Sequence, residues 1–387
     1  MFSTGMLSVL KSTARPQHNI LYSPNPLTER YRMKVAFLYD GPHPMHLAWA
    51  KSVGAVEVAN RFNTRTDAAM LKDRPDDGAA GKARGLDMVK NLSLRSLGLP
   101  ASSYFQGLVQ GAAGIKELDA DVLICEGRMG VVPGHMFKKL RGGRTVLITA
   151  DPFIWEIRDF QPSWRRRFER ILDGFDLVIS VSRMMYDLLP PKAQKKARIV
   201  HPSFESGYFG LKPEPGARAI AYLGALDERK GVDLSMEAFI EAKRSVPDAR
   251  FILIGKGPLK EKYQDVEGAE FPGFVPDPGE YFKRCSLFLH LSRFDPYPVS
   301  VLEGMAAGLV PVVSEMTGSR ELLEPIDSGL VAKTPHDAAQ KIVSLMKDPS
   351  ATAALSARCR QAVRGWDKQR SILDFQQAFR ETIGEWN

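Results

Sequence analysis

The stretch from Ser292 to Leu322, SRFDPYPVSVLEGMAAGLVPVVSEMTGSREL, decides the fold predicted for this chain. It predicts a loop, a helix that begins at Pro298 or Val299, a short buried strand, and a polar turn into another helix. Two carboxylates, Asp295 in the loop and Glu303 in the helix, stand eight positions apart. Considered singly, Asp295 would cap the following helix or turn, a role favoured for Asp before Pro, and Glu303 would be an exposed helix residue. Their meaning therefore depends on the sequence around them.

Short apolar runs separated by helical segments recur on both sides of this stretch. In the first half of the chain they are Lys34–Tyr39, Asp121–Cys125, Thr145–Thr149 and Leu177–Val181. In the second half they are Ala219–Leu223, Arg250–Ile254, Leu287–Leu291 and Val310–Val313. Such runs are typical of parallel strands that helices cover on both faces. We therefore predict an α/β protein with two doubly wound, Rossmann-like domains.

The predicted domain limits follow from a break in composition. Residues 201–218 are rich in Pro, Gly and Ser, which predicts a linker. We expect an N-terminal domain over 33–200, a C-terminal domain over 219–365, and a last helix over 366–387. Residues 1–32 are expected to be a disordered N-terminal extension.

The composition excludes several classes of protein. No run reaches the roughly eighteen apolar residues of a membrane span. Three scattered cysteines, Cys125, Cys285 and Cys359, predict buried free thiols of a reducing compartment, and hence a cytoplasmic protein. The net charge of +8 favours anionic partners, but no recognition motif supports binding to nucleic acid.

Two glycine turns in the second half are candidates for holding phosphate. Tyr222–Gly231, YLGALDERKG, leaves a strand at Gly224 and opens a helix behind Arg229 and Lys230. A helix start offers free N–H groups and a positive dipole end, which suit a diphosphate, although a solvated basic turn has the same pattern. Phe251–Pro258, FILIGKGP, is a second strand and glycine turn, without the spacing of a Walker loop.

Together these segments resemble the signature of the retaining GT-B glycosyltransferases, the group 1 (family 4-like) family that moves a sugar from a nucleotide donor. The resemblance rests on the Asp295–Glu303 spacing, Lys230–Gly231, the Phe251–Pro258 turn, and a Gly308-x-x-Pro311 break. It implies the GT-B fold, in which two Rossmann-like domains face a cleft and the C-terminal helix crosses back to the first domain. It also implies a nucleotide-diphosphate sugar as co-substrate, with no other cofactor and no metal ion.

The resemblance assigns roles to residues of the second domain. Glu303 would hold the donor ribose, and Lys230 would neutralise the diphosphate. Asp295 would face the donor sugar as a catalytic carboxylate that stabilises positive charge at the anomeric carbon. The further donor-binding positions are Gly224, Val275, Pro298, Val299 and Ser300.

Three positions depart from the family pattern. Asp295 stands where Glu is usual, and Pro298 stands where a glycine is common. Ala225 stands where the family has an arginine, and Arg229 is a candidate to supply that charge from a neighbouring position.

The first domain resembles the family less, and its candidates stay open between two interpretations. His43 and His46 follow the first strand; they would bind the acceptor, or else be surface histidines at a helix start. Glu126, after the next strand, is the third acceptor-side candidate. Asp151 follows a further strand, where many relatives carry a histidine near the reacting sugar. It is a catalytic candidate or a cap before Pro152.

Residues 163–172, SWRRRFERIL, combine an apolar stripe with four arginines. This pattern suits peripheral contact with an anionic membrane at its inner face. An apolar stripe that packs on its own domain, with the arginines solvated, is the more frequent arrangement.

The predicted function is transfer of a sugar, with retained anomeric configuration, from a nucleotide-diphosphate sugar to an unidentified glycan, lipid or small molecule. One alternative is a non-catalytic partner subunit with the same fold, for which Ala225 argues. The other is a sugar-nucleotide epimerase, which would need further acid–base residues facing the sugar.

Overall fold

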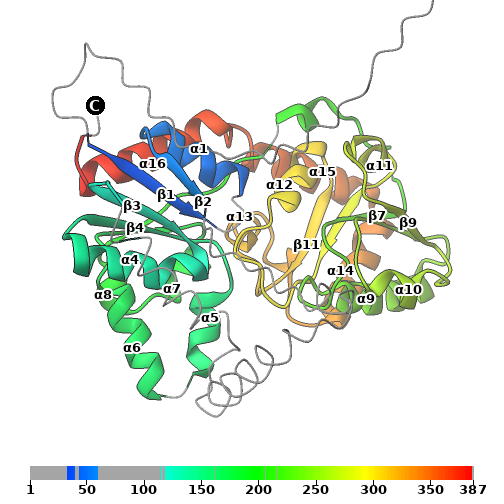
Figure 1. The fold of residues 1–387 in the computed structure, drawn as a ribbon. Helices are drawn as coiled ribbons and strands as arrows, with labels where there is room; N and C mark the ends of the chain where they lie inside the picture. The colour runs from blue at the N-terminus through cyan, green and yellow to red at the C-terminus, as the bar shows by residue number, and fades with distance from the viewer. Residues whose placement is uncertain are drawn as a thin grey trace, which may run out of the picture. The chain divides into compact units, whose positions relative to one another are not determined.

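The computed structural model describes residues 33–39, 43–59, 115, 118–160, 162–204, 206–214 and 216–385 (Figure 1). The predicted N-terminal extension over 1–32 lies outside these residues. Within them the chain builds two separate six-stranded sheets, one after the other along the sequence.

The first sheet has the strand order β2-β1-β3-β4-β5-β6, and all of its neighbouring pairs are parallel. Its strands are β1 (Val35–Tyr39), β2 (Val56–Ala59), β3 (Val122–Glu126), β4 (Arg144–Thr149), β5 (Leu177–Ser180) and β6 (Ala197–Ile199). The connecting helices are α1 (Pro44–Ser52), α4 (Gly127–Arg141), α5 (Phe153–Glu156), α6 (Pro162–Leu172), α7 (Arg183–Asp187) and α8 (Pro191–Gln194).

The second sheet has the strand order β12-β11-β10-β7-β8-β9 and is also parallel throughout. Its strands are β7 (Ala219–Leu223), β8 (Arg250–Ile254), β9 (Ala269–Gly273), β10 (Leu287–His290), β11 (Val310–Ser314) and β12 (Val331–Ala332). The helices are α9 (Val232–Ser245), α10 (Leu259–Tyr263), α11 (Gly279–Lys283), α12 (Val299–Ala307), α13 (Arg320–Leu323), α14 (Pro335–Lys347) and α15 (Pro349–Ala362).

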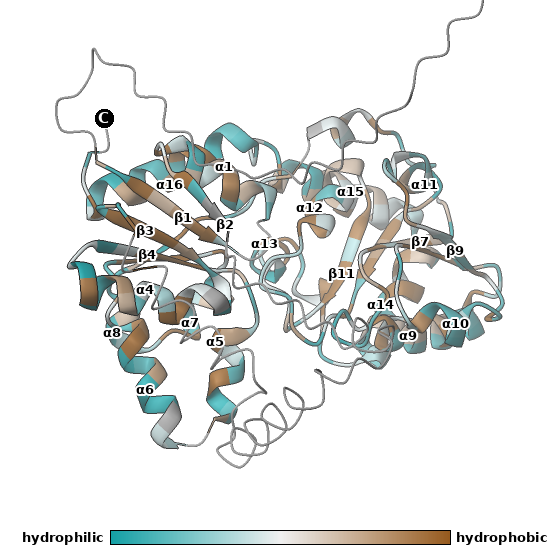
Figure 2. Ribbon diagram, viewed as in Figure 1, coloured by the Kyte–Doolittle hydropathy of each residue, from teal (hydrophilic) through white to brown (hydrophobic). Residues whose placement is uncertain are grey.

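The two parallel sheets confirm the predicted GT-B architecture. Figure 2 shows hydrophobic residues concentrated along the strands, while the helices carry hydrophilic residues as well. This is the distribution expected when helices bury both faces of a parallel sheet. The predicted residue limits of the two domains stay predictions.

The last helix, α16 (Lys368–Thr382), returns to the first sheet and packs on α1 (Figure 1). The ring of Trp49 is fully buried and stacks on Phe375, with centroids 5.6 Å apart. Its indole N–H donates to the Ser371 hydroxyl at 2.9 Å. The predicted crossing of the C-terminal helix is therefore confirmed.

The basic helix α6 packs on its own domain. Phe168 and Leu172 are buried, and the Phe168 ring meets Phe153 and Phe160 edge-on. Its arginines, residues 165–167 and 170, are exposed. The packing interpretation accounts for the apolar stripe, so the membrane contact stays a prediction. None of the helices that the structure describes is long and apolar enough to cross a membrane.

The three cysteines are buried free thiols, as predicted. Burial raises the pKa of each thiol above its ordinary value, so none carries a reactive thiolate at neutral pH.

Candidate functional site

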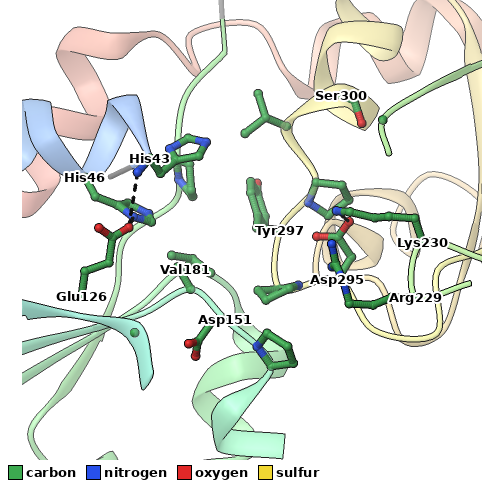
Figure 3. Close-up of a pocket in the computed structure, with 18 of the residues that line it drawn as sticks. His43, His46, Glu126, Asp151, Val181, Arg229, Lys230, Asp295, Tyr297 and Ser300 are labelled. Carbon is green, nitrogen blue, oxygen red and sulfur yellow. Dashed lines mark hydrogen bonds and ion pairs between the residues drawn. The ribbon is translucent and has the colours of Figure 1, made fainter. Parts of the chain in front are cut away.

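A cavity of about 760 Å³ opens at the carboxyl ends of strands from both sheets (Figure 3). We call its two sides the first wall, residues 43, 46, 126–128 and 150–152, and the second wall, residues 223–224, 229–230, 295–300 and 303. Ligands of open α/β sheets bind at this edge, where the strands end and the loops diverge. Every predicted site residue except Val275 lines the cavity.

Val275 lies in the loop after β9 and is half-buried. It is not among the described residues that line the cavity. Its predicted role in donor binding therefore stays a prediction.

Asp295 is the most enclosed charged group of the second wall. It is only 5% exposed, and its Oδ2 accepts hydrogen bonds from Lys230 Nζ at 2.5 Å and from His290 Nε2 at 2.9 Å. Burial opposes ionisation, but the His290 hydrogen bond and the Lys230 charge outweigh it and hold the pKa of Asp295 well below its usual range. Asp295 is therefore an ionised carboxylate next to the cavity. It does not cap α12, whose N-cap residue is Pro298.

The backbone of Asp295 is fixed as firmly as its side chain. Its N–H donates to Met316 O at 2.9 Å, and its carbonyl accepts from Gly318 N at 2.8 Å. A Cβ at Gly318 would overlap the Pro296 carbonyl, so only glycine permits this approach. The loop before α12 is thus tied to the segment that follows β11.

The turn between β7 and α9 holds the two basic residues of the second wall. The Arg229 carbonyl accepts from Arg293 N and from Ser292 Oγ, both at 3.0 Å. Gly231 has φ +63°, and a Cβ there would overlap the Leu291 carbonyl. The turn therefore rests directly on the loop that leads to Asp295.

Ala225, which stands at the position of the missing arginine, lies in the same turn. Its carbonyl accepts a hydrogen bond from the Tyr222 hydroxyl at 2.7 Å. Arg229 lines the cavity while Ala225 does not, which is consistent with Arg229 as a substitute cation.

The start of α12 completes the second wall with Pro298, Val299, Ser300 and Glu303. N–H groups in the first turn of a helix have no partner inside the helix, and the dipole there is positive. Glu303 is half-buried and lies one turn further along the helix. This wall therefore offers N–H donors and two cations to an anionic group, with a carboxylate beside them.

Buried His46 pairs with half-buried Glu126 on the first wall. His46 is 2% exposed, and its Nδ1 lies 2.5 Å from Glu126 Oε1. His46 Nε2 and Glu126 Oε2 are buried and have no hydrogen-bond partner among the described residues. His43 differs, because its Nδ1 accepts from Met45 N at 3.3 Å and caps α1. The surface interpretation is therefore wrong for His46, whereas His43 does stand at a helix start.

Asp151 both lines the cavity and organises the first wall. Its carboxylate accepts from Arg128 N at 2.6 Å and from Phe153 N at 3.3 Å, so it holds the starts of α4 and α5. Burial raises the pKa of Asp151, and the two backbone donors offset this only in part. Both interpretations of Asp151 thus have a structural basis.

Three cavity or near-cavity residues were missed by the sequence analysis. Arg128 lines the first wall and pairs with Glu156; Tyr297 lines the second wall and is 6% exposed. His290 lies behind Asp295 and is fully buried. In the sequence it is the one polar residue of the apolar run LFLHL. Because a buried polar group needs a hydrogen-bond partner, this position could have indicated that His290 contacts another polar residue.

The second half of the chain carries a family signature. Residues 209–366 match the family described as glycosyl transferases group 1. This half of the chain is similar in sequence to group 1 glycosyltransferases. The match covers the second sheet and leaves the first sheet outside it.

Two known glycosyl-transferring enzymes have sequences similar to part of this chain. Glycogen synthase of Bordetella petrii is 29% identical over 133 residues, which are 31% of this chain and 25% of that protein. One of the subunits of the phosphatidylinositol N-acetylglucosaminyltransferase of Arabidopsis thaliana is 28% identical over 35% of this chain and 33% of that protein. The chain therefore spans between a quarter and a third of these two relatives.

Solved structures share the GT-B glycosyltransferase fold over nearly the whole chain. HepE of Anabaena in complex with UDP-glucose has a TM-score of 0.65 at 17% identity, covering 90% of this chain and 100% of that one. Sucrose-phosphate synthase of Thermosynechococcus elongatus has a TM-score of 0.66 at 15% identity, covering 91% and 99%.

Proposed function

We propose that this protein is a retaining glycosyltransferase that moves a hexosyl group from a nucleotide-diphosphate sugar to an acceptor, without a metal ion. The observation that carries the proposal is the Lys230–Asp295 pair beside the start of α12, in a half of the chain with the group 1 signature. Cations and helix N–H groups would bind the diphosphate, and Glu303 would hold the ribose. HepE, with the same fold, forms complexes with UDP and with UDP-glucose.

The proposed chemistry divides between the two walls. The bond from the anomeric carbon to the phosphate oxygen breaks, and Lys230 and Arg229 would stabilise the charge of the leaving diphosphate. Asp295, already ionised, would stabilise the positive charge that develops at the anomeric carbon. The acceptor hydroxyl would approach from the first wall, past His43, His46, Glu126 and Asp151, form the new bond to the anomeric carbon and pass its proton to the departing diphosphate.

We further propose a cellular location and a surface for membrane contact. We place the protein in the cytoplasm, where its buried thiols stay reduced. The exposed arginines of α6 would allow contact with an anionic membrane if the acceptor is a lipid.

A screen of donor hydrolysis tests the proposal. UDP-, GDP- and ADP-sugars would be incubated with wild type, Glu303→Ala and Asp295→Ala, and the released nucleoside diphosphate measured. We expect at least one donor to be hydrolysed by wild type and hardly by either variant. Glu280→Ala, on an exposed surface away from the cavity, is the matched control and should behave as wild type. Activity that survives both cavity substitutions would remove these residues from the site.

The alanine at position 225 favours a second function, that of a non-catalytic partner subunit, because the arginine that the family has there would add a cation to the diphosphate site. Such a protein would not hydrolyse any donor in the same screen. It would also not be stabilised against heat by a nucleoside diphosphate.

A further inference from the structure

His290 is a fully buried polar residue to which the proposed function assigns no part. It ends β10, where it pairs with Val313 of β11, and its ring stacks on Tyr222 with centroids 5.8 Å apart. Its Nε2 lies 2.9 Å from Asp295 Oδ2, and its Nδ1 is buried with no partner among the described residues. Because an ionised carboxylate can only accept, Nε2 must carry the proton in this pair.

The oxygen that His290 contacts is the one that Lys230 contacts. Asp295 Oδ2 therefore has two donors, one behind it in the core and one facing the cavity. Burial lowers the pKa of His290, so the ring is neutral and contributes a hydrogen bond rather than a second positive charge. Lys230 is the cation of this cluster, and its side chain is 20% exposed.

The balance of these two donors decides how firmly Lys230 is held. A buried carboxylate with a single donor would bind its cation tightly, because releasing the cation would leave the charge unsatisfied. A second donor that stays in place keeps the carboxylate satisfied while the ammonium turns its remaining N–H groups to another anion. The backbones of His290 and Asp295 are both held in place, because β10 pairs with β11 and the Asp295 loop is hydrogen-bonded to the segment that follows β11.

We propose that His290 is a positioning residue of the donor site, which satisfies Asp295 from behind so that Lys230 can share its ammonium with the donor diphosphate. The inference rests on the proposed function for the identity of the diphosphate. The effect of His290 on Lys230 itself can be tested without any nucleotide.

Two variants separate the hydrogen bond from the shape of the ring. His290→Phe keeps an aromatic ring against Tyr222 and removes the donor, whereas His290→Gln keeps an N–H near the position of Nε2. Thermal unfolding of each variant reports whether it is folded.

The first readout is the reactivity of the Lys230 amine towards acetic anhydride, followed by peptide mass spectrometry. Losing a hydrogen bond to a charged group is worth about tenfold in an equilibrium. We therefore expect Lys230 to react several-fold more slowly in His290→Phe and at the wild-type rate in His290→Gln. Equal rates in His290→Phe and wild type would overturn the proposal. Lys260, at an exposed site on α10, is the internal control.

The second readout is affinity for UDP, GDP and ADP, each compared with its nucleoside monophosphate. We expect His290→Phe to weaken diphosphate binding about tenfold, with a smaller loss for the monophosphate and recovery in His290→Gln. A purely structural role would weaken both ligands alike. If wild type binds no nucleoside diphosphate, the proposed function fails, while the reactivity of Lys230 still decides the role of His290.

A measurement on the wild type covers the case in which the variants do not fold. Long-range ¹H–¹⁵N spectra of histidine-labelled protein should show His290 neutral, with its proton on Nε2, between pH 6 and 8. A proton on Nδ1, or a charged ring, would contradict the proposal.

Discussion

The two walls of the cavity are built differently. On the second wall Asp295 has two donors, and glycines 231 and 318 let one backbone segment lie directly on another. On the first wall the pair of His46 and Glu126 leaves one buried nitrogen and one buried oxygen without a partner among the described residues. The family signature covers only the second wall's domain. The two buried carboxylate oxygens therefore differ: Asp295 Oδ2 has two donors, whereas Glu126 Oε2 has none among the described residues.

The largest effect should follow from removing the negative charge of Asp295 on the second wall. Asp295→Asn is expected to lower donor hydrolysis about 100-fold, because a fixed charge aimed at the reacting centre is lost. The measurement is release of nucleoside diphosphate under saturating donor. A rate within about threefold of wild type would show that the carboxylate charge does not act in the reaction.

The second effect tests the close approach of backbone segments. Gly231→Ala should lower the free energy of unfolding by about 3 kcal/mol or more, since it adds a clash with the Leu291 carbonyl to left-handed strain. Gly365→Ala is the matched control: Gly365 has φ +83° with nothing near its Cβ position, so strain alone should cost about 1 kcal/mol. Urea unfolding compares the two, and equal losses would show that the contact with Leu291 is not tight.

A smaller effect separates the functions of the two walls. His46→Phe should lower the free energy of unfolding by about 1–3 kcal/mol, because Glu126 loses its closest donor. Affinity for a nucleoside diphosphate should stay unchanged in calorimetry, since this pair is expected to face the acceptor. A loss of nucleotide affinity as large as that in Glu303→Ala would assign the first wall to the donor as well.

The smallest effect is a pH dependence. Asp295 has a lowered pKa in the folded state, so its contribution to stability is complete above the ordinary aspartate value of 3.8 and is lost as pH falls towards the folded pKa. The difference in unfolding free energy between wild type and Asp295→Asn should therefore be constant from pH 5 to 7 and shrink below about pH 4. A difference that grows on acidification would contradict the assignment of an ionised Asp295.

The sequence predicted most of the second sheet because its strands are short, uniformly apolar runs. The runs at 219–223, 250–254 and 310–313 all became strands with at most one residue of difference. Strands β2, β6, β9 and β12 were not predicted. They are the outer strands of the two sheets, and β6 and β12 are only three and two residues long. Such short edge strands depend on a neighbour for pairing and leave little pattern in the sequence.

The site was predictable to the extent that its residues stand near each other in the sequence or match a family pattern. Asp295, Glu303 and Lys230 could be found in this way. The contact of His290 with Asp295 could not, because it depends on how the loop after β10 folds back over the strand end. The pairing of His46 with Glu126 joins residues 80 positions apart and depends on the order of β1 and β3 in the sheet.

Thermal unfolding with UDP, GDP and ADP tests whether the cavity binds a nucleoside diphosphate. A ligand present at about 100 times its dissociation constant adds about 2.7 kcal/mol of stability, which raises Tm by several degrees for a domain of this size. We predict that at least one of the three diphosphates raises Tm of the wild type in this way, and that Glu303→Ala removes the shift. An unchanged Tm with all three diphosphates would show that the cavity is not a nucleoside-diphosphate site.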